Sequence, residues 1–291
     1  MKLTAMFDVV IIGAGPAGIT CALRAKELSM NPLLLERKVI ANTILDYPKG
    51  KKLLGVVGFF QKAPKELVKF YAKDLKRAKI DVREGEEVIS INKKNGFFEV
   101  STKKEKFESK SVVLATGIQG LPQTLGVPGE NKKHVHYSLD DPKDYKGKTV
   151  IVVGGGDTAI EAATSLSDAG ANVVISYRQD SFFRAKELNV ENINKSNAVV
   201  KFSTNLTEIK NKKVILRHST ELVEEIRADD VFILVGTVKN TEFYKKIGLN
   251  LDEKENIVHD EKTLETTIPG LFVAGDIVTK EKLILPARCQ G

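Results

Sequence analysis

Cysteine, methionine and tryptophan are scarce in this chain, and the scarcity of cysteine excludes whole classes of site. The 291 residues include two cysteines, three methionines and no tryptophan. The cysteines, Cys21 and Cys289, lie at opposite ends of the sequence, which excludes a local CxxC pair and a cysteine-rich metal centre. We expect Cys21 to be a core residue of the helix in which it lies.

Long apolar runs and a leader sequence are also missing. No run approaches the ~20 consecutive apolar residues that span a bilayer. The chain passes from Met1 directly into an apolar strand at Phe7, without a leader of signal-peptide form. We therefore expect a cytoplasmic protein with no membrane partner.

Patterns for metal and nucleic-acid binding are missing as well. His134 and His136 are close, but no cysteine or carboxylate pattern accompanies them, so we expect loop histidines and no metal. The net charge is +7, yet no basic tract interleaved with aromatic residues indicates nucleic-acid binding. The lysine excess has two interpretations at this point, a solvated surface or electrostatic steering of an acidic partner or substrate.

Two glycine-rich turns are the strongest features that are present. Each follows an apolar strand and precedes an amphipathic segment, the arrangement that points backbone N–H groups and a helix dipole at a pyrophosphate. The first turn consists of Gly13, Ala14, Gly15, Pro16, Ala17 and Gly18. The second consists of Gly154, Gly155, Gly156, Asp157, Thr158 and Ala159. Two such sites predict electron transfer between two bound cofactors.

The first turn lies in a complete βαβ unit, with a strand at 7–12, a helix at 16–29 and a strand at 32–35. The first glycine of the turn permits the sharp bend, the second lets phosphates approach the backbone, and the third lets the helix pack on the strand. Glu36, at the tip of the second strand, is the expected acceptor for an adenosine ribose.

The second βαβ unit comprises a strand at 149–153, a helix at 157–169 and a strand at 172–177. No acid at its tip can accept from a ribose 2′-hydroxyl. Arg178 and Arg184 could instead pair with a 2′-phosphate, to which a guanidinium fork is well suited. We therefore expect NADPH, with NADH less favoured.

The chain resembles the low-molecular-weight thioredoxin-reductase-like flavoproteins of the two-dinucleotide-binding-domain family. The resemblance rests on four ordered segments that span nearly the whole sequence: 9–18, 113–117, 152–161 and 268–276. It implies an α/β fold of two Rossmann-like domains, FAD and NAD(P)H as cofactors, and a homodimer. The FAD domain would comprise 1–117 and 241–291, with the NAD(P)H domain, 118–240, inserted in it.

The resemblance also implies roles for particular residues. Glu36 and the first turn would hold the ADP half of FAD, and Asp276 would bond its ribityl or phosphate region. Asn42 and Thr43 would lie close to the flavin, whereas Tyr47 would either flank its ring or anchor a turn. The other expected cofactor contacts are Arg37, Val88, Ala115, Thr116, Gly117, Gly236 and Gly275.

One departure from thioredoxin reductases is informative. They carry a redox CxxC shortly before the second turn, but residues 134–142 here contain no sulfur, so the usual route to thioredoxin is closed. In this respect the chain is more similar to two other branches, the ferredoxin/flavodoxin–NADP reductases and the bacillithiol-disulfide-reductase-like proteins.

We therefore expect hydride transfer from NADPH to FAD, followed by electron delivery to a small acidic carrier such as ferredoxin or flavodoxin. Reduction of a low-molecular-weight disulfide or of oxygen is an alternative, and so is a non-catalytic FAD-binding subunit. No catalytic acid or base is expected, because the chemistry belongs to the flavin.

The carboxyl end carries two further expectations. In relatives a helix follows the Gly-Asp motif, which is Gly275 and Asp276 here, and this helix faces the flavin. This sequence reaches only the start of that helix at Gly291. We expect either that the chain continues or that this end of the flavin site is incomplete. Cys289 is close to where relatives approach the flavin and is a candidate lone redox thiol.

Overall fold

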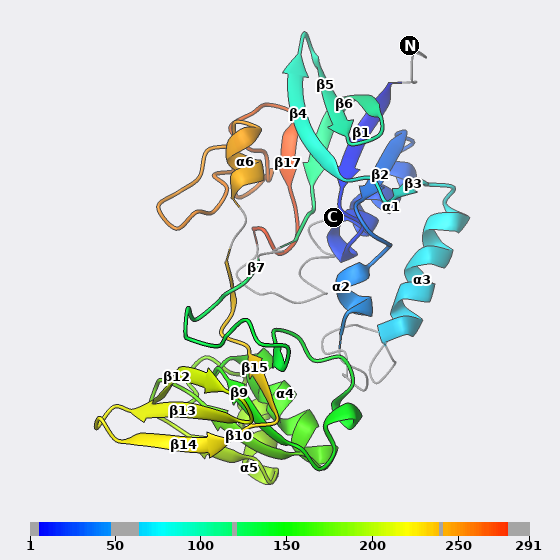
Figure 1. Cartoon of the computed structure of the whole chain (residues 1–291). Helices are drawn as coiled ribbons and strands as arrows, with labels where there is room; N and C mark the ends of the chain where they lie inside the picture. Colours follow the sequence, from blue (N-terminus) through cyan, green and yellow to red (C-terminus); the bar gives the residue numbers. More distant parts are fainter. Residues whose placement is uncertain (1–5, 48–63, 118–120, 239–240, 279–291) are drawn as a thin grey trace. The chain divides into compact units, whose positions relative to one another are not determined.

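Two compact units make up the fold. The computed structural model describes residues 6–47, 64–117, 121–238 and 241–278. The first unit comprises Met1–Gln119 and Lys239–Gly291, and the inserted unit comprises Gly120–Val238 (Figure 1). The sequence placed these boundaries after 117 and after 240.

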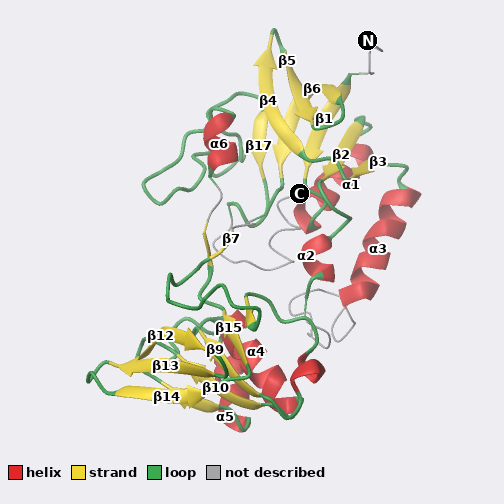
Figure 2. Cartoon of the chain, viewed as in Figure 1, coloured by secondary structure: helices red, strands yellow, loops and turns green. Residues whose placement is uncertain are grey.

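The first unit is built on a seven-stranded sheet in the order β3-β2-β1-β6-β5-β4, with β17 paired to β6 (Figure 2). Strands β1, β2, β3, β6 and β17 are parallel neighbours, whereas β4, β5 and β6 form an antiparallel meander. The elements described in this unit are β1 (Phe7–Ile12), α1 (Pro16–Glu27), β2 (Pro32–Glu36), α2 (Asn42–Leu45), α3 (Pro64–Arg77), β3 (Asp81–Glu84), β4 (Val88–Lys94), β5 (Phe97–Thr102), β6 (Lys106–Leu114), α6 (Glu242–Lys246) and β17 (Leu271–Val273).

Strand β1 is apolar throughout because both of its faces are buried. Val9 and Ile11 join one core cluster, together with residues of α1 and α3, whereas Val10 and Ile12 join a second cluster on the opposite face. A parallel strand covered on both sides reads as a continuous apolar run rather than an alternating one. This burial fixes the end of β1, and hence the first turn, in the centre of the sheet.

The inserted unit repeats this plan with a five-stranded parallel sheet, in the order β11-β10-β9-β15-β8. A three-stranded antiparallel sheet, β12-β13-β14, packs on the odd-numbered residues of β9, and α4 packs on the even-numbered ones. The elements are β7 (Leu121–Pro122), β8 (Val135–His136), the 3-10 helix η1 (Pro142–Tyr145), β9 (Thr149–Val153), α4 (Asp157–Asp168), β10 (Asn172–Ser176), α5 (Glu187–Lys195), β11 (Val199–Lys201), β12 (Thr204–Lys210), β13 (Lys213–His218), β14 (Val223–Arg227), β15 (Asp230–Ile233) and β16 (Thr237–Val238).

Some expected boundaries need correction. Helix α1 ends at Glu27 rather than at 29, because Ser29 adopts a left-handed conformation with φ 61° that a helix cannot continue. His136 lies in strand β8 and not in a loop. Among the residues described, no helix combines the length and apolarity needed to cross a membrane.

Candidate functional sites

The first turn leaves β1 where the carboxyl ends of three strands meet. The Gly13 N–H donates to the Leu35 carbonyl at 2.8 Å, and the Ala115 N–H donates to the Ile12 carbonyl at 2.8 Å. Gly13 has φ 106°, and a side chain there would overlap the carbonyl of Ala115. Gly18 is equally confined, because a Cβ would overlap the Gly13 carbonyl oxygen. The chain's own packing therefore demands these two glycines.

Gly15, unlike Gly13 and Gly18, has open space beside it, and this space is suited to a ligand. Gly15 is the N-cap of α1 with φ −78°, which any residue can adopt, and a Cβ there would meet no atom within 4 Å. No side chain caps the helix. A helix N-terminus left uncapped beside open space is suited to an anion. The site thus fits the pyrophosphate of a dinucleotide.

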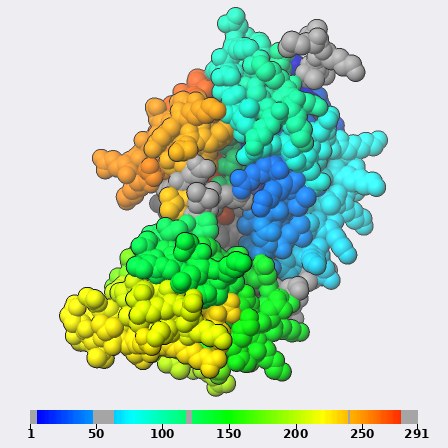
Figure 3. Space-filling model, in the orientation of Figure 1, coloured from blue at the N-terminus to red at the C-terminus, as the bar shows by residue number. Residues whose placement is uncertain are grey.

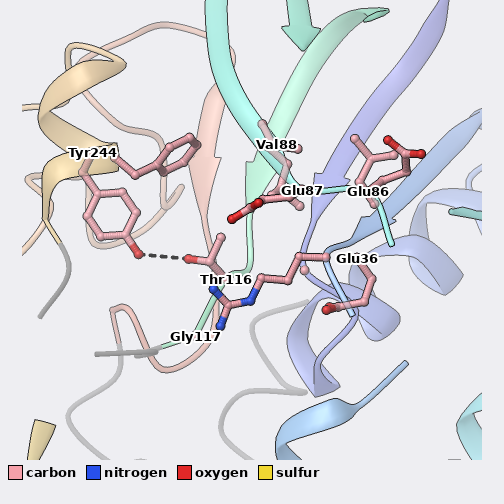
Figure 4. Close-up of a pocket in the computed structure, with 12 residues that line it drawn as sticks. Glu36, Glu86, Glu87, Val88, Thr116, Gly117 and Tyr244 are labelled. Carbon is pink, nitrogen blue, oxygen red and sulfur yellow. Dashed lines mark hydrogen bonds between the residues drawn. The ribbon is translucent and has the colours of Figure 1, made fainter. Parts of the chain in front are cut away.

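A cavity of about 180 Å³ opens beside this turn, and its lining includes several of the residues expected to bind the cofactor. Its lining residues are Ile12, Gly13, Leu35, Glu36, Arg37, Glu86, Glu87, Val88, Thr116, Gly117, Phe243 and Tyr244. Figure 4 shows Glu36, Val88 and Thr116 arriving from three different strands or strand ends.

Glu36 holds the turn as well as facing this cavity. One of its carboxylate oxygens accepts from the Ala14 N–H at 2.9 Å, and the other accepts from the Lys38 N–H at 2.8 Å. Each carboxylate oxygen has a second lone pair, so the side chain can still accept from a ribose hydroxyl. The ribose role predicted from the sequence stays a prediction.

Thr116 is joined to a residue that the sequence did not indicate. Its hydroxyl lies 2.9 Å from the hydroxyl of Tyr244, which reaches across from α6 (Figure 4). Burial raises the pKa of Tyr244, so this phenol stays protonated at neutral pH and can donate. Phe243, Glu86 and Glu87 were missed as well, since no local motif marks them.

Glu86 is almost fully buried, at 8% exposure, and ionised. Hydrogen bonding to Thr102 and then to Lys104 lowers its pKa, against the opposing effect of burial. One carboxylate oxygen lies 3.2 Å from the Lys104 ammonium. The wall of the cavity therefore carries a fixed negative charge that is partly neutralised from outside.

The segment 41–47 and the Gly-Asp motif lie near the first turn but do not line this cavity. The Ala41 N–H donates to the Ala14 carbonyl at 2.8 Å, which ties the start of α2 to the turn. Asn42 donates to the Asp46 carboxylate at 2.5 Å, Thr43 is exposed, and Tyr47 packs against the core cluster that contains α1. A Cβ at Gly275 would come within 2.8 Å of the Ala17 Cβ, so the backbone just before Asp276 passes beside α1.

The second turn repeats the pattern in the inserted unit. Gly154 has φ 143°, and a side chain there would overlap the Leu234 carbonyl. Gly156 is the uncapped N-cap of α4, and a Cβ there would meet nothing within 4 Å. A cavity of about 460 Å³ opens beside it. Its lining includes the expected residues Gly154, Gly156, Asp157, Thr158, Arg178, Arg184 and Gly236. Ala159 is fully buried below them.

Three aromatic rings pack together near the arginines in the sequence of this unit. The Tyr177 ring lies against Gly155, where a Cβ would overlap it, and stacks on Phe182 at 5.7 Å between ring centroids and 17°. Phe182 in turn meets Phe202 edge to face at 4.8 Å. Arg178 directly follows Tyr177, and Arg184 lies two residues after Phe182; both line the cavity with exposed side chains.

Asp157 has a structural role that the sequence did not predict. Its Oδ1 accepts from the Lys186 N–H and from the Asn189 side-chain amide, both at 2.8 Å. The Asn189 amide also donates to Glu161 at 3.1 Å. These bonds fasten the segment that carries Arg184 to the N-terminus of α4, whereas the sequence assigned Asp157 only to the cofactor.

His136 belongs to a polar cluster at the β8 edge of the five-stranded sheet of the inserted unit. Its Nε2 lies 2.7 Å from Asp230 Oδ1, and Lys148 lies 3.1 Å from the other oxygen of that carboxylate. The ring also packs on Phe232 at 4.9 Å between centroids. Within the described ranges no group of three histidine, cysteine, aspartate or glutamate residues could hold a metal.

Cys21 packs against the core cluster of α1, and burial raises the pKa of its thiol to about 11. A thiol with this pKa is not a nucleophile at neutral pH. Cys289 and the chain end at Gly291 lie outside the described residues.

Comparison with known proteins places both turns in one family. The sequence profile of the family described as pyridine nucleotide-disulphide oxidoreductase matches residues 10–275. A ferredoxin–NADP reductase of Ignicoccus hospitalis is 32% identical over 98% of this chain and 95% of its own. The bacilliredoxin reductase Bdr of Bacillus subtilis is 29% identical over 92% of this chain and 89% of its own.

Solved structures agree with these sequence matches. The bacillithiol disulfide reductase Bdr from Bacillus cereus superposes with a TM-score of 0.90 at 26% identity, covering 98% of this chain and 96% of that one. The thioredoxin reductase of T. acidophilum superposes with a TM-score of 0.87 at 30% identity, covering 99% and 95%.

Proposed function

We propose, since the chain belongs to the pyridine nucleotide-disulphide oxidoreductase family, that it transfers hydride from NADPH to FAD and passes the electrons to a small acidic carrier. The family and the named relatives make the chain an NAD(P)H-dependent flavoprotein oxidoreductase of the thioredoxin-reductase-like fold. An enzyme is thereby favoured over a non-catalytic subunit. The choice of FAD, NADPH and acceptor is the proposal.

The observation that carries the proposal is the pair of uncapped helix N-termini beside open space, one in each unit, each following a turn whose first glycine lines a cavity. We assign FAD to the first unit, where Gly15 admits a phosphate and Glu36 faces an adenosine ribose. The flavin supplies the two-electron chemistry when it is bound. The protein binds and orients it, and the bonded pair Thr116 and Tyr244 forms part of the wall of this cavity.

We assign NADPH to the inserted unit. Arg178 and Arg184 line the same cavity as Gly156, and no carboxylate ends strand β10 to bind a ribose 2′-hydroxyl. Two guanidinium groups at that position favour a 2′-phosphate. The 178–186 segment that carries them is held to α4 through Asp157.

The acceptor is assigned from charge and from the relatives' names. The net charge of +7 favours a partner of opposite sign. The relative from Ignicoccus hospitalis is named for ferredoxin. Homodimerisation and a cytoplasmic location stay predictions of the sequence.

Reduction of a low-molecular-weight disulfide is the second candidate. It is favoured by the two relatives named for bacilliredoxin and bacillithiol disulfide reduction. Within the described residues the one cysteine, Cys21, is unreactive at neutral pH. Such a reaction would therefore proceed without a dithiol in this part of the chain. Oxygen remains a third acceptor to test.

An anaerobic titration of the FAD-loaded protein with NADPH, followed by a panel of acceptors, tests the proposal. We expect NADPH to bleach the flavin absorbance and ferredoxin or flavodoxin to restore it at a rate that falls with ionic strength. Reoxidation only by disulfides, at a rate independent of salt, would favour the second candidate. A protein that took up no FAD would contradict both.

A further inference from the structure

The exposed side of helix α3 carries a row of lysines. Lys65, Lys69, Lys73 and Lys76 follow one another at intervals of four, four and three residues, which places them on one side of the helix. All four are exposed. The opposite side of α3 carries its buried residues and packs on α1 and α2.

These lysines differ from the lysines on the β-meander of the same unit, most of which have a carboxylate partner. The pairs on the meander are Lys94 and Lys106 with Glu99, Lys103 with Glu87, Lys104 with Glu86, and Lys110 with Asp8. No ion pair within 4.0 Å joins the four α3 lysines to any described residue, and Asp74, an acid on the same helix, pairs with Arg77. Among the residues that the structure describes, the row is therefore positive charge without an ion-pair partner.

Helix stability accounts for Lys76, which lies in the last turn near the negative end of the helix dipole, but not for the other three lysines. Like charges spaced three or four residues apart repel one another and weaken a helix. A lysine in the first turn, such as Lys65, also faces the positive end of the helix dipole. An alternation of lysine and glutamate would have solvated this face equally well. The cost of the row points to an interaction outside the fold.

The position of α3 gives the row its relevance to electron transfer. Helix α3 packs on α2, whose first residues Asn42 and Thr43 are the ones expected to contact the flavin. The start of α2 is tied to the first glycine turn through Ala41. In Figure 3 the atoms of α3 lie at the surface of this face of the molecule. A partner seated on the row would thus be separated from the expected flavin position by α3, roughly 10 Å wide, and by the start of α2.

We propose that this lysine row, defined as Lys65, Lys69, Lys73 and Lys76, is the docking surface for a small electron-carrier protein with an acidic face. The inference rests on the proposed function, because it names the surface on which that carrier is bound. The row extends ~16 Å at 1.5 Å per residue, a span that matches a protein patch rather than a small disulfide. Its charge steers the carrier during encounter and sets the salt dependence of the reaction.

Charge reversal in the FAD-loaded full-length protein tests the surface. The triple variant Lys69→Glu, Lys73→Glu, Lys76→Glu is compared with Lys133→Glu, Lys246→Glu, Lys262→Glu, which changes the net charge equally at exposed lysines elsewhere. Bacterial ferredoxin and flavodoxin are the protein acceptors, and menadione is an uncharged acceptor that needs no docking. Glutamate is a good helix former, and circular dichroism checks that α3 is retained.

We expect the α3 variant to show at least a tenfold higher KM for ferredoxin at low ionic strength, with menadione reduction unchanged. The difference should shrink at high salt because exposed charges are screened. The control variant should change the KM for ferredoxin less than threefold. The neutral variant Lys69→Gln, Lys73→Gln, Lys76→Gln should lie between wild type and the charge reversal.

The outcomes separate the surface from the function. If wild-type protein reduces either carrier and the α3 variant does so with the same KM and salt dependence, the docking surface is wrong while the proposed function stands. If both triple variants raise KM equally, net charge acts without a defined surface and the proposal is again overturned. If wild type reduces menadione but neither carrier, both the acidic-carrier function and its docking surface are overturned.

Discussion

The two glycine-rich turns lie at equivalent points of their sheets, yet side chains are excluded from different positions. Gly13 and Gly154 both have positive φ, and Gly15 and Gly156 both face open space. The turns diverge at the position of the third glycine, which is Gly18 in the first turn and is occupied by Ala159 in the second. There Gly18 leaves no room for a Cβ, whereas Ala159 carries one and is fully buried. The backbone of the first turn thus lies closer to its helix than that of the second.

The turns differ again at the strand tip that faces each of them. In the first unit, Glu36 bonds the Ala14 N–H and fixes the turn by its carboxylate. In the inserted unit, the Tyr177 ring lies against Gly155 and fixes the turn by contact. An acid is suited to a ribose hydroxyl, and the residue after an aromatic anchor, Arg178, is suited to a phosphate. The same kind of glycine-rich turn thus supports two nucleotide preferences, because the residues at the tip of the neighbouring strand differ.

The third position should give the largest difference between the two turns. Gly18→Ala forces a Cβ into the Gly13 carbonyl, so we expect a loss of about 3 kcal/mol in unfolding free energy and loss of bound FAD. Ala159→Gly should cost only ~1 kcal/mol, the usual helix penalty of glycine. Thermal unfolding and flavin absorbance per mole of protein measure both. Equal effects of the two variants would refute the comparison.

Substitutions at Gly15 and Gly156, the equivalent second positions of the two fingerprint turns, should affect ligand binding without affecting folding. A Cβ at Gly15 or Gly156 touches no protein atom, so Gly15→Ala and Gly156→Ala should each change unfolding free energy by less than ~1 kcal/mol. We expect Gly15→Ala to weaken FAD binding by roughly tenfold to a hundredfold, or about 1.4–2.7 kcal/mol. Gly156→Ala should retain FAD and raise the KM for NADPH instead. The two readouts would exchange if the cofactor assignment were reversed.

The arginines at the second strand tip should decide between NADPH and NADH. Hydrogen bonds to charged groups contribute about 1.5–3 kcal/mol each. Arg178→Gln and Arg184→Gln should therefore raise the KM for NADPH roughly tenfold or more and leave that for NADH unchanged. Steady-state kinetics with both nucleotides measures this ratio. The exposed Arg217→Gln serves as a control that should change neither value.

The bonds of Asp157 should affect the same ratio by a smaller amount. Asp157→Ala frees the Lys186 N–H and the Asn189 amide, so we expect the KM for NADPH to rise about tenfold or less, equivalent to one lost hydrogen bond. Asp157→Asn retains an acceptor oxygen and should recover most of the loss. An Asn variant as impaired as the Ala variant would mean that the negative charge, not the hydrogen bonding, is what matters.

Helix α1 contains a cysteine, Cys21, and α4 does not. The Cys21 thiol should make the unfolding free energy depend on pH only at high pH. Because burial raises the Cys21 pKa to about 11, the protonated thiol stabilises the fold below its unfolded pKa, and this contribution is lost as pH rises towards 11. Relative to Cys21→Ala, wild type should lose about 1.4 kcal/mol of unfolding free energy by pH 10, for a thiol pKa raised from 9.0 to about 11. Denaturant unfolding between pH 7 and 10 measures the difference. A constant difference would contradict the raised pKa.

Local sequence was sufficient for both βαβ units and for much of the two candidate sites. A buried strand, a glycine turn and a helix are adjacent in the chain, and their spacing reports their geometry. Val88 accordingly lines the first cavity, and Gly156 and Arg178 line the second. Gly15 does not line the first cavity but has open space beside it. The error at His136 arose because a two-residue strand paired to β15 has no periodicity to detect.

The sequence by itself determined that the chain holds two dinucleotide-binding units. Each is marked by a βαβ unit with a glycine-rich turn, which lies within about 30 consecutive residues. Only the tertiary structure decided which distant residues bond the residues that line each cavity. Tyr244 meets Thr116 across 128 residues of sequence, and Asp157 meets Asn189 across 32. Such partners are set by where sheets and helices pack, and packing brings together residues whose positions in the chain carry no mutual pattern.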